Sequence, residues 1–313
     1  MKDNIWDQIT LVFVAYNSNY HIDRLLKTLD TPVKVSISVT DGTDDMQKLQ
    51  ATSRHHISII TSEFDHGVAT AYNQAIAAVE TPFALQLNPD VDFSTECITE
   101  LLNLLLTNEN AACAGPLLLS GNKKKSFEEL DLLGPGEHLH QKATTIPEGP
   151  FCTWFIPGAI LLWRVKAFMD VGGLDENIYI YGDDVDICIR AAAKGYSMIL
   201  NPQAPAYHAG GKSAGKVTLA RRLRKTRNMT WGHLYMEQKY SSAEVSKNEA
   251  RNIKREKMWK FLLSVLSLNL KKAVGHYGAL TAASDYLKGV PFWGDEFDAL
   301  KRKKIANTSF GTD

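Results

Sequence analysis

The chain has 313 residues, of which 44% are hydrophobic and 22% charged, so it is long enough for one large domain or two modest ones with a buried core. Its four cysteines are widely spaced without a CxxC pair, which argues against a structural zinc site or a disulfide framework. The longest apolar runs, such as 261–270, are much shorter than the roughly 20 residues of a membrane span. Because residues 1–8 are polar and acidic and do not resemble a signal peptide, we expect a cytoplasmic protein.

The zero net charge hides two electrostatically different parts. Residues 1–211 carry 14 Lys and Arg against 26 Asp and Glu, whereas residues 212–272 carry 16 against 4. Such a basic region can bind nucleic acid, an anionic membrane surface or the acidic part of the same protein. No recognised nucleic-acid-binding motif accompanies it, so we do not expect nucleic acid as a partner.

Strand and helix patterns alternate through the first ninety residues. Apolar or alternating runs predict strands at 9–15, 33–39, 57–60 and 83–87. Helices are predicted at 21–29, after the turn 40–45 as far as about residue 53, and at 68–79. This order is typical of a parallel sheet with crossover helices, whose ligands lie beyond the carboxyl ends of the strands.

Three oxygen-bearing side chains follow the predicted strand 83–87 at every second position: Asn88, Asp90 and Asp92. Alone, the stretch is also typical of a turn, because Asn, Pro and Asp are turn formers. Tyr16, Asp41 and Gly67 lie near other strand ends, so the topology gathers all of these at one edge. Since Mg²⁺ and Mn²⁺ prefer oxygen ligands shared with substrate phosphates, we favour a metal and diphosphate site there.

The next elements are a helix at 95–106 and a strand at 112–119. We then predict a strand over 151–163, rich in aromatics and containing a Pro-Gly pair; it is either a floor under the substrate or an ordinary core strand. A helix begins at the acidic cluster Asp183-Asp184-Val185-Asp186 and ends at Gly195, and Asp186 can pair with Arg190 four residues later. A strand at 197–200 and a segment containing His208 follow.

The acidic cluster has two interpretations. Carboxylates in a first helical turn complement the helix dipole. Three carboxylates within four positions also repel one another. Because they directly follow the aromatic segment 179–181, this repulsion favours a nearby cation or a cationic transition state.

Taken together, these motifs resemble the family 2 inverting glycosyltransferases with a GT-A fold, and most closely the rhamnosyltransferase-like enzymes that build O-antigen and other surface polysaccharides. The resemblance covers roughly 9–213 and rests on eight ordered segments. They are VAYNS at 14–18, VTDGTDD at 39–45, HGVATAYNQAI at 66–76, LNPDVD at 87–92, PGAILLWR at 157–164, GGLDE at 172–176, YGDDVDICIR at 181–190 and the segment around His208.

The resemblance implies a fold and a division of the chain. We expect an α/β GT-A domain, a Rossmann-like mixed sheet flanked by helices, over 1–213, followed by a basic, mainly helical region over 214–313.

The resemblance also implies site residues. Asp184 would be the catalytic base beside Asp183, which stands where the family usually has Glu. The nucleotide would be bound by Ala15, Tyr16, Asp41, Gly67, Asn73 and Asn88, the metal by Asp90, Asp92 and His208, and the acceptor by Trp154, Gly158 and Arg190.

Two registers of the metal motif stay open. In one, Asn88 replaces the first acid of the family's DxD element and Asp90 is the main ligand; in the other, Asp90 and Asp92 are both ligands.

The implied activity is transfer of a sugar from a UDP- or dTDP-sugar, dTDP-rhamnose among them, to a glycan or polyprenyl-diphosphate-linked acceptor with Mn²⁺ or Mg²⁺. The alternatives are a catalytically silent glycan- or nucleotide-binding assembly subunit and a sugar-nucleotide pyrophosphorylase, although 15–18 lacks the latter's glycine-rich phosphate loop.

The basic C-terminal region predicts helices at 217–240 and 243–272. The second has an apolar side bordered by lysines and formed by Trp259, Phe261, Leu262, Val265, Leu266 and Leu270. Such a helix can lie in an anionic membrane interface or pack on the catalytic domain. The first interpretation predicts peripheral contact with the membrane through 214–272, at the inner face of the cytoplasmic membrane.

Overall fold

A computed structural model describes residues 4–40, 46–61, 66–120, 147–210 and 218–290. The chain forms two compact units. The first comprises residues 1–176 and 183–215 and contains the sheet. The second comprises residues 216–313 together with the short segment 177–182, and it is helical. Asp41 is the one predicted site residue that lies outside the described residues.

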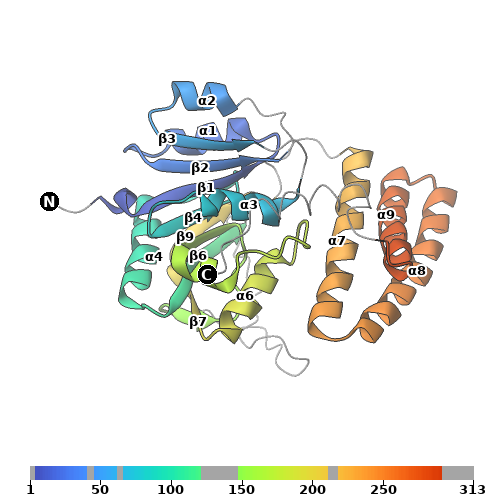
Figure 1. Cartoon of the computed structure of the whole chain (residues 1–313). Helices are drawn as coiled ribbons and strands as arrows, with labels where there is room; N and C mark the ends of the chain where they lie inside the picture. The colour runs from blue at the N-terminus through green and yellow to red at the C-terminus, as the bar shows by residue number, and fades with distance from the viewer. Residues whose placement is uncertain (1–3, 41–45, 62–65, 121–146, 211–217, 291–313) are drawn as a thin grey trace. The chain divides into compact units, whose positions relative to one another are not determined.

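One mixed sheet organises the first unit, and the described part of the chain contributes nine strands to it (Figure 1). Their order is β3-β2-β1-β4-β8-β6-β9-β5, with β7 pairing to β9 outside this path. The strands are β1 (Ile9–Ala15), β2 (Lys34–Val39), β3 (His56–Thr61), β4 (Phe83–Leu87), β5 (Val91–Asp92), β6 (Ala111–Ser120), β7 (Phe151–Thr153), β8 (Ile160–Arg164) and β9 (Ser197–His208).

The carboxyl ends of four strands meet at one edge of this sheet. Strands β1, β2, β3 and β4 are parallel, with Ala15 opposite Val39 and Phe13 opposite Leu87. Tyr16 and Asn88, which follow β1 and β4, therefore lie on the same edge. This confirms the predicted parallel arrangement and the mixed, helix-flanked sheet, since β8 adds an antiparallel strand beside β4.

Helices cover both faces of the sheet. One hydrophobic core packs α1 (Asn19–Lys27), α2 (Met46–Thr52) and α4 (Thr95–Thr107) on one face, and a second packs α3 (Val68–Ala77), α5 (Val165–Val171) and α6 (Asp183–Ala193) on the other. Strand β1 supplies both cores: Leu11 and Phe13 point into the first and Val12 and Val14 into the second. Continuous apolar runs are expected when a strand is covered on both faces. The single-turn 3-10 helix η1 (Ile5–Asp7) precedes β1.

Two predicted strands differ from the observed ones. The stretch 151–163 is not one strand but two, β7 and β8, because the chain leaves the sheet around Pro157 and Gly158. The strand predicted at 197–200 instead continues to His208. The extension matters, because its far end pairs with β5 and so brings His208 opposite Val91.

The helical unit contains α7 (Leu219–Tyr240), α8 (Ala243–Leu266) and α9 (Leu270–Leu287), and α9 packs against both others. Its small core takes Leu234, Ala250 and Ala283, one residue from each helix. The single helix predicted at 243–272 was wrong: Leu268 has φ +55° and the Asn269 side chain caps a new helix by accepting from the Lys272 amide. None of the described helices has both the length and the apolar character required to span a membrane.

The segment 177–182 lies on α7 although it directly precedes α6 in the chain. The Asn177 side-chain amide donates to the Tyr235 hydroxyl at 3.4 Å, and Nζ of Lys225 lies 5.0 Å from the centroid of the Tyr181 ring. Gly232 of α7 faces the carbonyl of Tyr181, which itself has φ +66°. The helical unit therefore holds the six residues that lead into the acidic cluster.

Candidate active site

Two potential metal ligands meet where β5 pairs with β9. Oδ1 of Asp90 lies 3.4 Å from Nε2 of His208, and the Asn88 side-chain amide lies 3.3 Å from the same nitrogen. The β5–β9 pairing causes this, because Asp90 immediately precedes β5 and its carbonyl accepts from the Ala209 amide at 3.0 Å. Asp90 is buried, so its carboxylate is shielded from bulk water.

This donor set fits a divalent cation. Two ligands that each lie about 2.1 Å from one ion, at roughly right angles or slightly more, are about 3 to 3.5 Å apart, as Asp90 and His208 are. The carboxylate oxygen and imidazole nitrogen together suit Mn²⁺, and Asn88 is within reach. Among the described residues no three His, Cys, Asp or Glu side chains form a metal-binding group. The protein would thus supply a small share of the ligands, as is usual where substrate phosphates and water complete the shell.

Asp92 has different surroundings. Its carboxylate pairs with Arg24 of α1 at 2.9 Å, and the side chain is 59% exposed. Successive strand residues point to opposite faces, so Val91 enters the core whereas Asp92 turns to the surface. The structure brings Asp90 and His208 together and leaves Asp92 with Arg24. A ligand role for Asp92 stays a prediction.

Tyr72 of α3 reaches the end of β4, between the carboxylates of Asp90 and Asp183 that act on it electrostatically. Its hydroxyl donates to the carbonyl of Leu87 at 2.9 Å and lies 3.4 Å from Oδ1 of Asn88. Burial, and then the neighbouring carboxylates of Asp183 and Asp90, raise the pKa of Tyr72 far above its usual value. The phenol therefore stays protonated, and both clusters lie close enough to it to influence its ionisation.

Asp184 is fixed against the loop that precedes β8. Its Oδ2 accepts from the Gly158 amide at 3.1 Å and its Oδ1 from the Val185 amide at 2.9 Å. Gln86 of β4 supports this arrangement by donating to the Gly158 carbonyl at 2.9 Å, and it accepts from the Trp163 indole at 3.0 Å. Gly158 is tightly enclosed: a Cβ there would lie 3.3 Å from the Cβ of Asp184. Gly158 thus positions the carboxylate of Asp184, and its contact with the acceptor stays a prediction.

Asp186, the last carboxylate of the acidic cluster, forms a structural ion pair. Asp186 is completely buried and pairs with Arg190 at 2.6 Å, which confirms the predicted i, i+4 contact. Arg190 also donates to the carbonyls of Val171 and Gly173. These bonds tie α6 to the end of α5 and occupy much of the guanidinium predicted to bind the acceptor. Asp183 is buried at the start of α6.

The predicted nucleotide site begins where β1 and β2 end. The Ala15 carbonyl accepts from both the amide and the hydroxyl of Thr40, at 3.1 and 3.2 Å, so the two strand ends are joined. The Tyr16 amide donates to the Ser18 hydroxyl at 3.1 Å. Gly67, at φ +86°, occupies the N-cap of α3, a conformation that glycine adopts at low cost.

Asn73, also predicted to bind nucleotide, has a scaffolding position in the structure. Its amide donates to the Leu174 carbonyl and to Glu176, and its oxygen accepts from the Leu174 amide at 2.8 Å. A Cβ at Gly173 would lie 2.6 Å from that oxygen. Asn73 therefore clamps the GGLDE loop onto α3.

Trp154, predicted to contact the acceptor, lies in the loop between β7 and β8 with its ring 5.5 Å from that of Phe155. Its indole Nε1 is buried and has no hydrogen-bond partner among the described residues.

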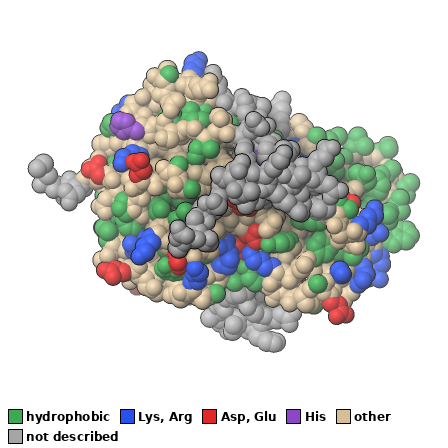
Figure 2. Space-filling model, in the orientation of Figure 1, with side chains coloured by type: hydrophobic (Ala, Val, Ile, Leu, Met, Phe, Trp, Pro, Cys, Tyr) green, Lys and Arg blue, Asp and Glu red, His purple; other side chains and the backbone are tan. Residues whose placement is uncertain are grey.

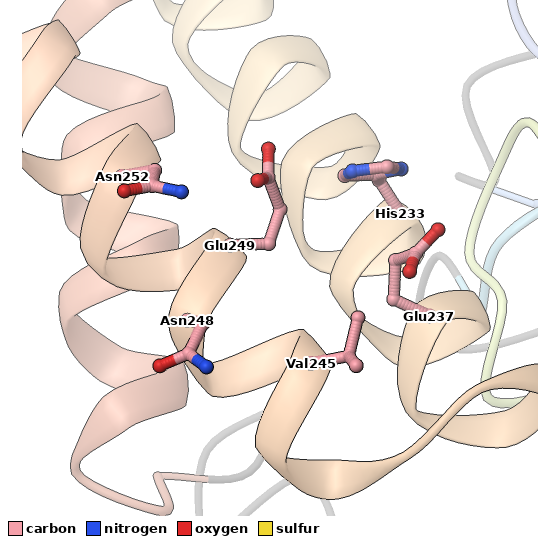
Figure 3. A pocket seen from close by; sticks show the side chains of 6 residues that line it. All are labelled: His233, Glu237, Val245, Asn248, Glu249 and Asn252. Carbon is pink, nitrogen blue, oxygen red and sulfur yellow. The ribbon is translucent and has the colours of Figure 1, made fainter.

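A pocket in the helical unit contains none of the predicted site residues (Figure 3). It opens between α7 and α8 and is lined by His233, Glu237, Val245, Asn248, Glu249 and Asn252.

Sequence reasoning missed Gln86 and Tyr72. The available signal for Gln86 was a polar side chain inside an otherwise apolar buried strand, which is rare unless it forms specific hydrogen bonds. Tyr72 lies within one of the recognised segments, but nothing in its local sequence indicates that it reaches the end of β4.

Comparison with known proteins identifies the family. The family model described as glycosyl transferase family group 2 matches residues 90–287, which is more than half of the chain. The chain belongs to this glycosyltransferase family. The match begins at Asp90 and includes the acidic cluster, and it extends through α7, α8 and α9.

Individual glycosyltransferase relatives are distant in sequence. An N-acetylglucosaminyl-diphospho-decaprenol L-rhamnosyltransferase of Mycobacterium tuberculosis is 24% identical over 67% of this chain and 78% of its own length. The O-antigen chain rhamnosyltransferase WbaN of Salmonella anatum is 24% identical over 64% of this chain and 65% of its own. The resemblance to family 2 enzymes, with rhamnosyltransferases among the relatives, is confirmed.

Solved structures agree on the fold. The mannosyltransferase PcManGT of Pyrobaculum calidifontis, in complex with GDP-Man and Mn²⁺, superposes with a TM-score of 0.54 at 15% identity, over 97% of this chain and 81% of that one. GalNAc-T7, solved with UDP, GalNAc and Mn²⁺, gives 0.53 at 12% identity over 75% of this chain and 51% of that one. At such identities the likeness establishes the GT-A fold.

Proposed function

We propose that this glycosyltransferase moves a sugar from a UDP- or dTDP-sugar, with dTDP-rhamnose the first candidate, to a hydroxyl of a glycan or polyprenyl-diphosphate-linked acceptor, with inversion at the anomeric carbon. The acceptor class and the rhamnose donor are supported by the printed activities of the relatives, which are rhamnosyltransferases for a decaprenol-linked sugar and for O-antigen chains. The proposed setting is surface polysaccharide synthesis at the cytoplasmic face of the membrane.

One observation carries the proposal: the Asp90–His208 pair and the separately oriented carboxylate of Asp184 lie around one strand end. Asn88 and Gln86 are two positions apart at the end of β4, Asn88 contacting His208 and Gln86 supporting the Gly158–Asp184 contact. The carboxylates of Asp90 and Asp183 both raise the pKa of Tyr72, whose hydroxyl lies 3.4 Å from Oδ1 of Asn88. A sugar transferase needs a bound cation and a catalytic base at opposite ends of the bond that is broken, and we assign these roles to the Asp90–His208 pair and to Asp184.

In the proposed reaction, Asp184 accepts the proton of the acceptor hydroxyl as that oxygen attacks the anomeric carbon. The bond between this carbon and the diphosphate oxygen breaks, and the nucleoside diphosphate leaves from the opposite face. Because the displacement is single, the configuration inverts and no covalent intermediate with the enzyme forms. The backbone amides of Gly158 and Val185 hold the carboxylate in place for this step.

Asp90 and His208 would hold the Mn²⁺ or Mg²⁺ ion at the other end. When bound, such an ion offsets the negative charge that develops on the departing diphosphate. Asn88 would orient the imidazole of His208, and the protonated hydroxyl of Tyr72 fixes the end of β4 that carries Asn88. The base of the donor is expected at Ala15, Tyr16 and Asp41.

The decisive experiment is a transfer assay with a panel of UDP-, dTDP- and GDP-sugars, with Mn²⁺, in wild-type protein and Asp184→Asn. Thermal shift against the same panel first selects the donor. We expect one donor to stabilise both proteins and to be consumed by the wild type alone. If a donor binds tightly but neither protein turns it over with any glycan or lipid-linked acceptor, the chain is a silent binding subunit and the proposed reaction is wrong.

A further inference from the structure

An exposed apolar surface lies where α8 and α9 meet. We call it the α8–α9 tip and define it by Met258, Trp259, Leu262, Leu263, Val265, Leu266, Leu268 and Leu270. All eight are exposed: Leu266 and Leu268 retain 80% and 86% of their accessible surface, and Trp259 retains 66%. Figure 2 shows hydrophobic side chains gathered at the right-hand edge of this view, with Lys and Arg side chains beside them.

The exposure follows from how the hairpin is built. Trp259, Leu263 and Leu266 are spaced four and three residues apart, so they share one face of α8. The core of the helical unit uses other positions of these helices, Ala250 and Ala283 among them. The tip residues therefore lie outside this core. Contiguous apolar surface of this kind is unusual on a protein surface and marks an interaction site.

The tip is also strongly basic. Residues 254–272 carry six Lys and Arg against a single acidic residue, Glu256. Glu256 is paired with Lys257 and Lys260, which lower its pKa to about 2, so it stays ionised and its charge is compensated. Lys271 and Lys272 are exposed at the start of α9, next to Leu268 and Leu270.

We propose that the α8–α9 tip inserts into the interfacial region of an anionic phospholipid bilayer. Leucines and a tryptophan bordered by lysines match a surface in which acyl chains lie beneath negatively charged headgroups. A second copy of this chain matches the tip less well, because joining two tips would bring two lysine clusters together. The inference deepens the proposed function, since a polyprenyl-linked acceptor would be presented at such a surface.

The test is flotation of full-length protein with vesicles of phosphatidylcholine alone or mixed with phosphatidylglycerol. We expect binding to the anionic vesicles only. Leu266→Gln with Leu268→Gln should reduce it at least tenfold, as an order-of-magnitude estimate from the apolar area withdrawn. Lys271→Gln with Lys272→Gln should reduce it by about fivefold or more for each charge. Raising the salt concentration should weaken the wild type but change the lysine variant less.

Matched controls separate the tip from general effects. Leu106→Gln replaces an exposed leucine of α4, and Lys247→Gln with Lys288→Gln removes two exposed lysines at the opposite ends of α8 and α9. These variants should bind like wild type. Absence of vesicle binding, or binding that the tip variants retain, would overturn the proposal. So would concentration-dependent self-association that the leucine variant abolishes without any vesicle binding, because the occupant would then be a second copy.

Nucleotide binding in the same proteins keeps this test apart from the proposed function. Calorimetric titration with UDP, dTDP and Mn²⁺ should give the same affinity for wild type and both tip variants. Vesicle binding without any nucleotide binding would leave the tip assignment in place and contradict the transferase proposal. Nucleotide binding and transfer without vesicle binding would do the reverse.

Discussion

Nε2 of His208 lies 3.4 Å from Oδ1 of Asp90, a contact created by the pairing of β5 with the far end of β9. If this pair holds the metal, Asp90→Ala and His208→Ala should each remove the gain in nucleotide affinity that Mn²⁺ produces. Asp92→Asn is the matched control, because Asp92 pairs with Arg24 at the surface. Calorimetric titration of UDP or dTDP with and without Mn²⁺ measures the gain. Equal loss in Asp92→Asn would instead support the register in which Asp90 and Asp92 are both ligands.

Removing the proposed base should affect chemistry and not binding. Asp184→Asn keeps the size of the side chain and its ability to accept from Gly158, but it cannot take the acceptor's proton. We expect the transfer rate to fall by about 10²- to 10⁴-fold, with nucleotide affinity nearly unchanged. Steady-state transfer and calorimetry on the same preparation measure both. Transfer at the wild-type rate would show that Asp184 is not the base.

Gly158→Ala tests the positioning of that carboxylate. The added methyl group would lie 3.3 Å from Cβ of Asp184 and 3.2 Å from Nε2 of Gln86, so both side chains must give way by a few tenths of an ångström. Strain of about 1–3 kcal/mol is typical of such overpacking, and we expect kcat to fall at least about tenfold. Gly149→Ala is the control, since nothing lies within 4 Å of its added methyl group. Comparable kcat values for the two variants would argue against a positioning role.

The Asp186–Arg190 pair should contribute to stability. Asp186→Ala removes the fully buried carboxylate that pairs with Arg190 and leaves the guanidinium to the carbonyls of Val171 and Gly173. Removing one partner of a buried ion pair costs about 3–5 kcal/mol in the free energy of unfolding. Asp23→Ala removes a pair of the same i, i+4 spacing, with Lys27, that is exposed to solvent. That change should cost less than about 1 kcal/mol. Urea denaturation compares them, and equal costs would contradict the structural role of the buried pair.

His55 should make stability fall on acidification. Its Nδ1 accepts from the Val33 amide and its Nε2 lies 3.0 Å from the Leu26 carbonyl, so the ring is buried in its neutral form. Burial holds the pKa of His55 below its ordinary value of 6.5. At pH values between the folded-state pKa and the ordinary pKa of 6.5, the unfolded chain binds more protons than the folded chain. The stability that neutral His55 contributes is therefore fully present above pH 6.5 and is lost as the pH falls through the folded-state pKa.

The check is the thermal unfolding midpoint at about pH 7 and about pH 5. His55→Gln should show a smaller drop in midpoint than the wild type. His56→Gln, at the exposed neighbouring position, should show the wild-type drop. An unchanged drop in His55→Gln would mean that other groups cause the acid sensitivity.

Local patterns were sufficient for most of the sheet. Strands β1 and β4 were predicted with their observed bounds because predominantly apolar runs bounded by turn residues are distinctive. The division of 151–163 was missed because its aromatic residues suit a strand throughout. The break after Leu266 was missed because Ser267, Leu268 and Asn269 lack glycine and proline, and the left-handed backbone of Leu268 leaves no trace in the sequence.

The candidate site was predictable as far as its residues act locally. Family motifs indicated Asp90, Asp184 and His208, and spacing alone gave the Asp186–Arg190 pair. The contacts that distinguish neighbours within a motif are long-range. The Arg24–Asp92 pair and the support of Gly158 by Gln86 depend on strand register and helix placement, which no local pattern encodes.

The position of residues 177–182 on α7 has a practical consequence for exchanging parts between relatives. The block that packs together is discontinuous in sequence, because it combines this hexapeptide with the helices after residue 216. A chimaera joined only near residue 216 would present a foreign α7 to the native Asn177 and Tyr181. Exchanging residues 177–182 together with the helices after residue 216 preserves the contacts between them. The exchanged hexapeptide then ends at Gly182, directly before Asp183.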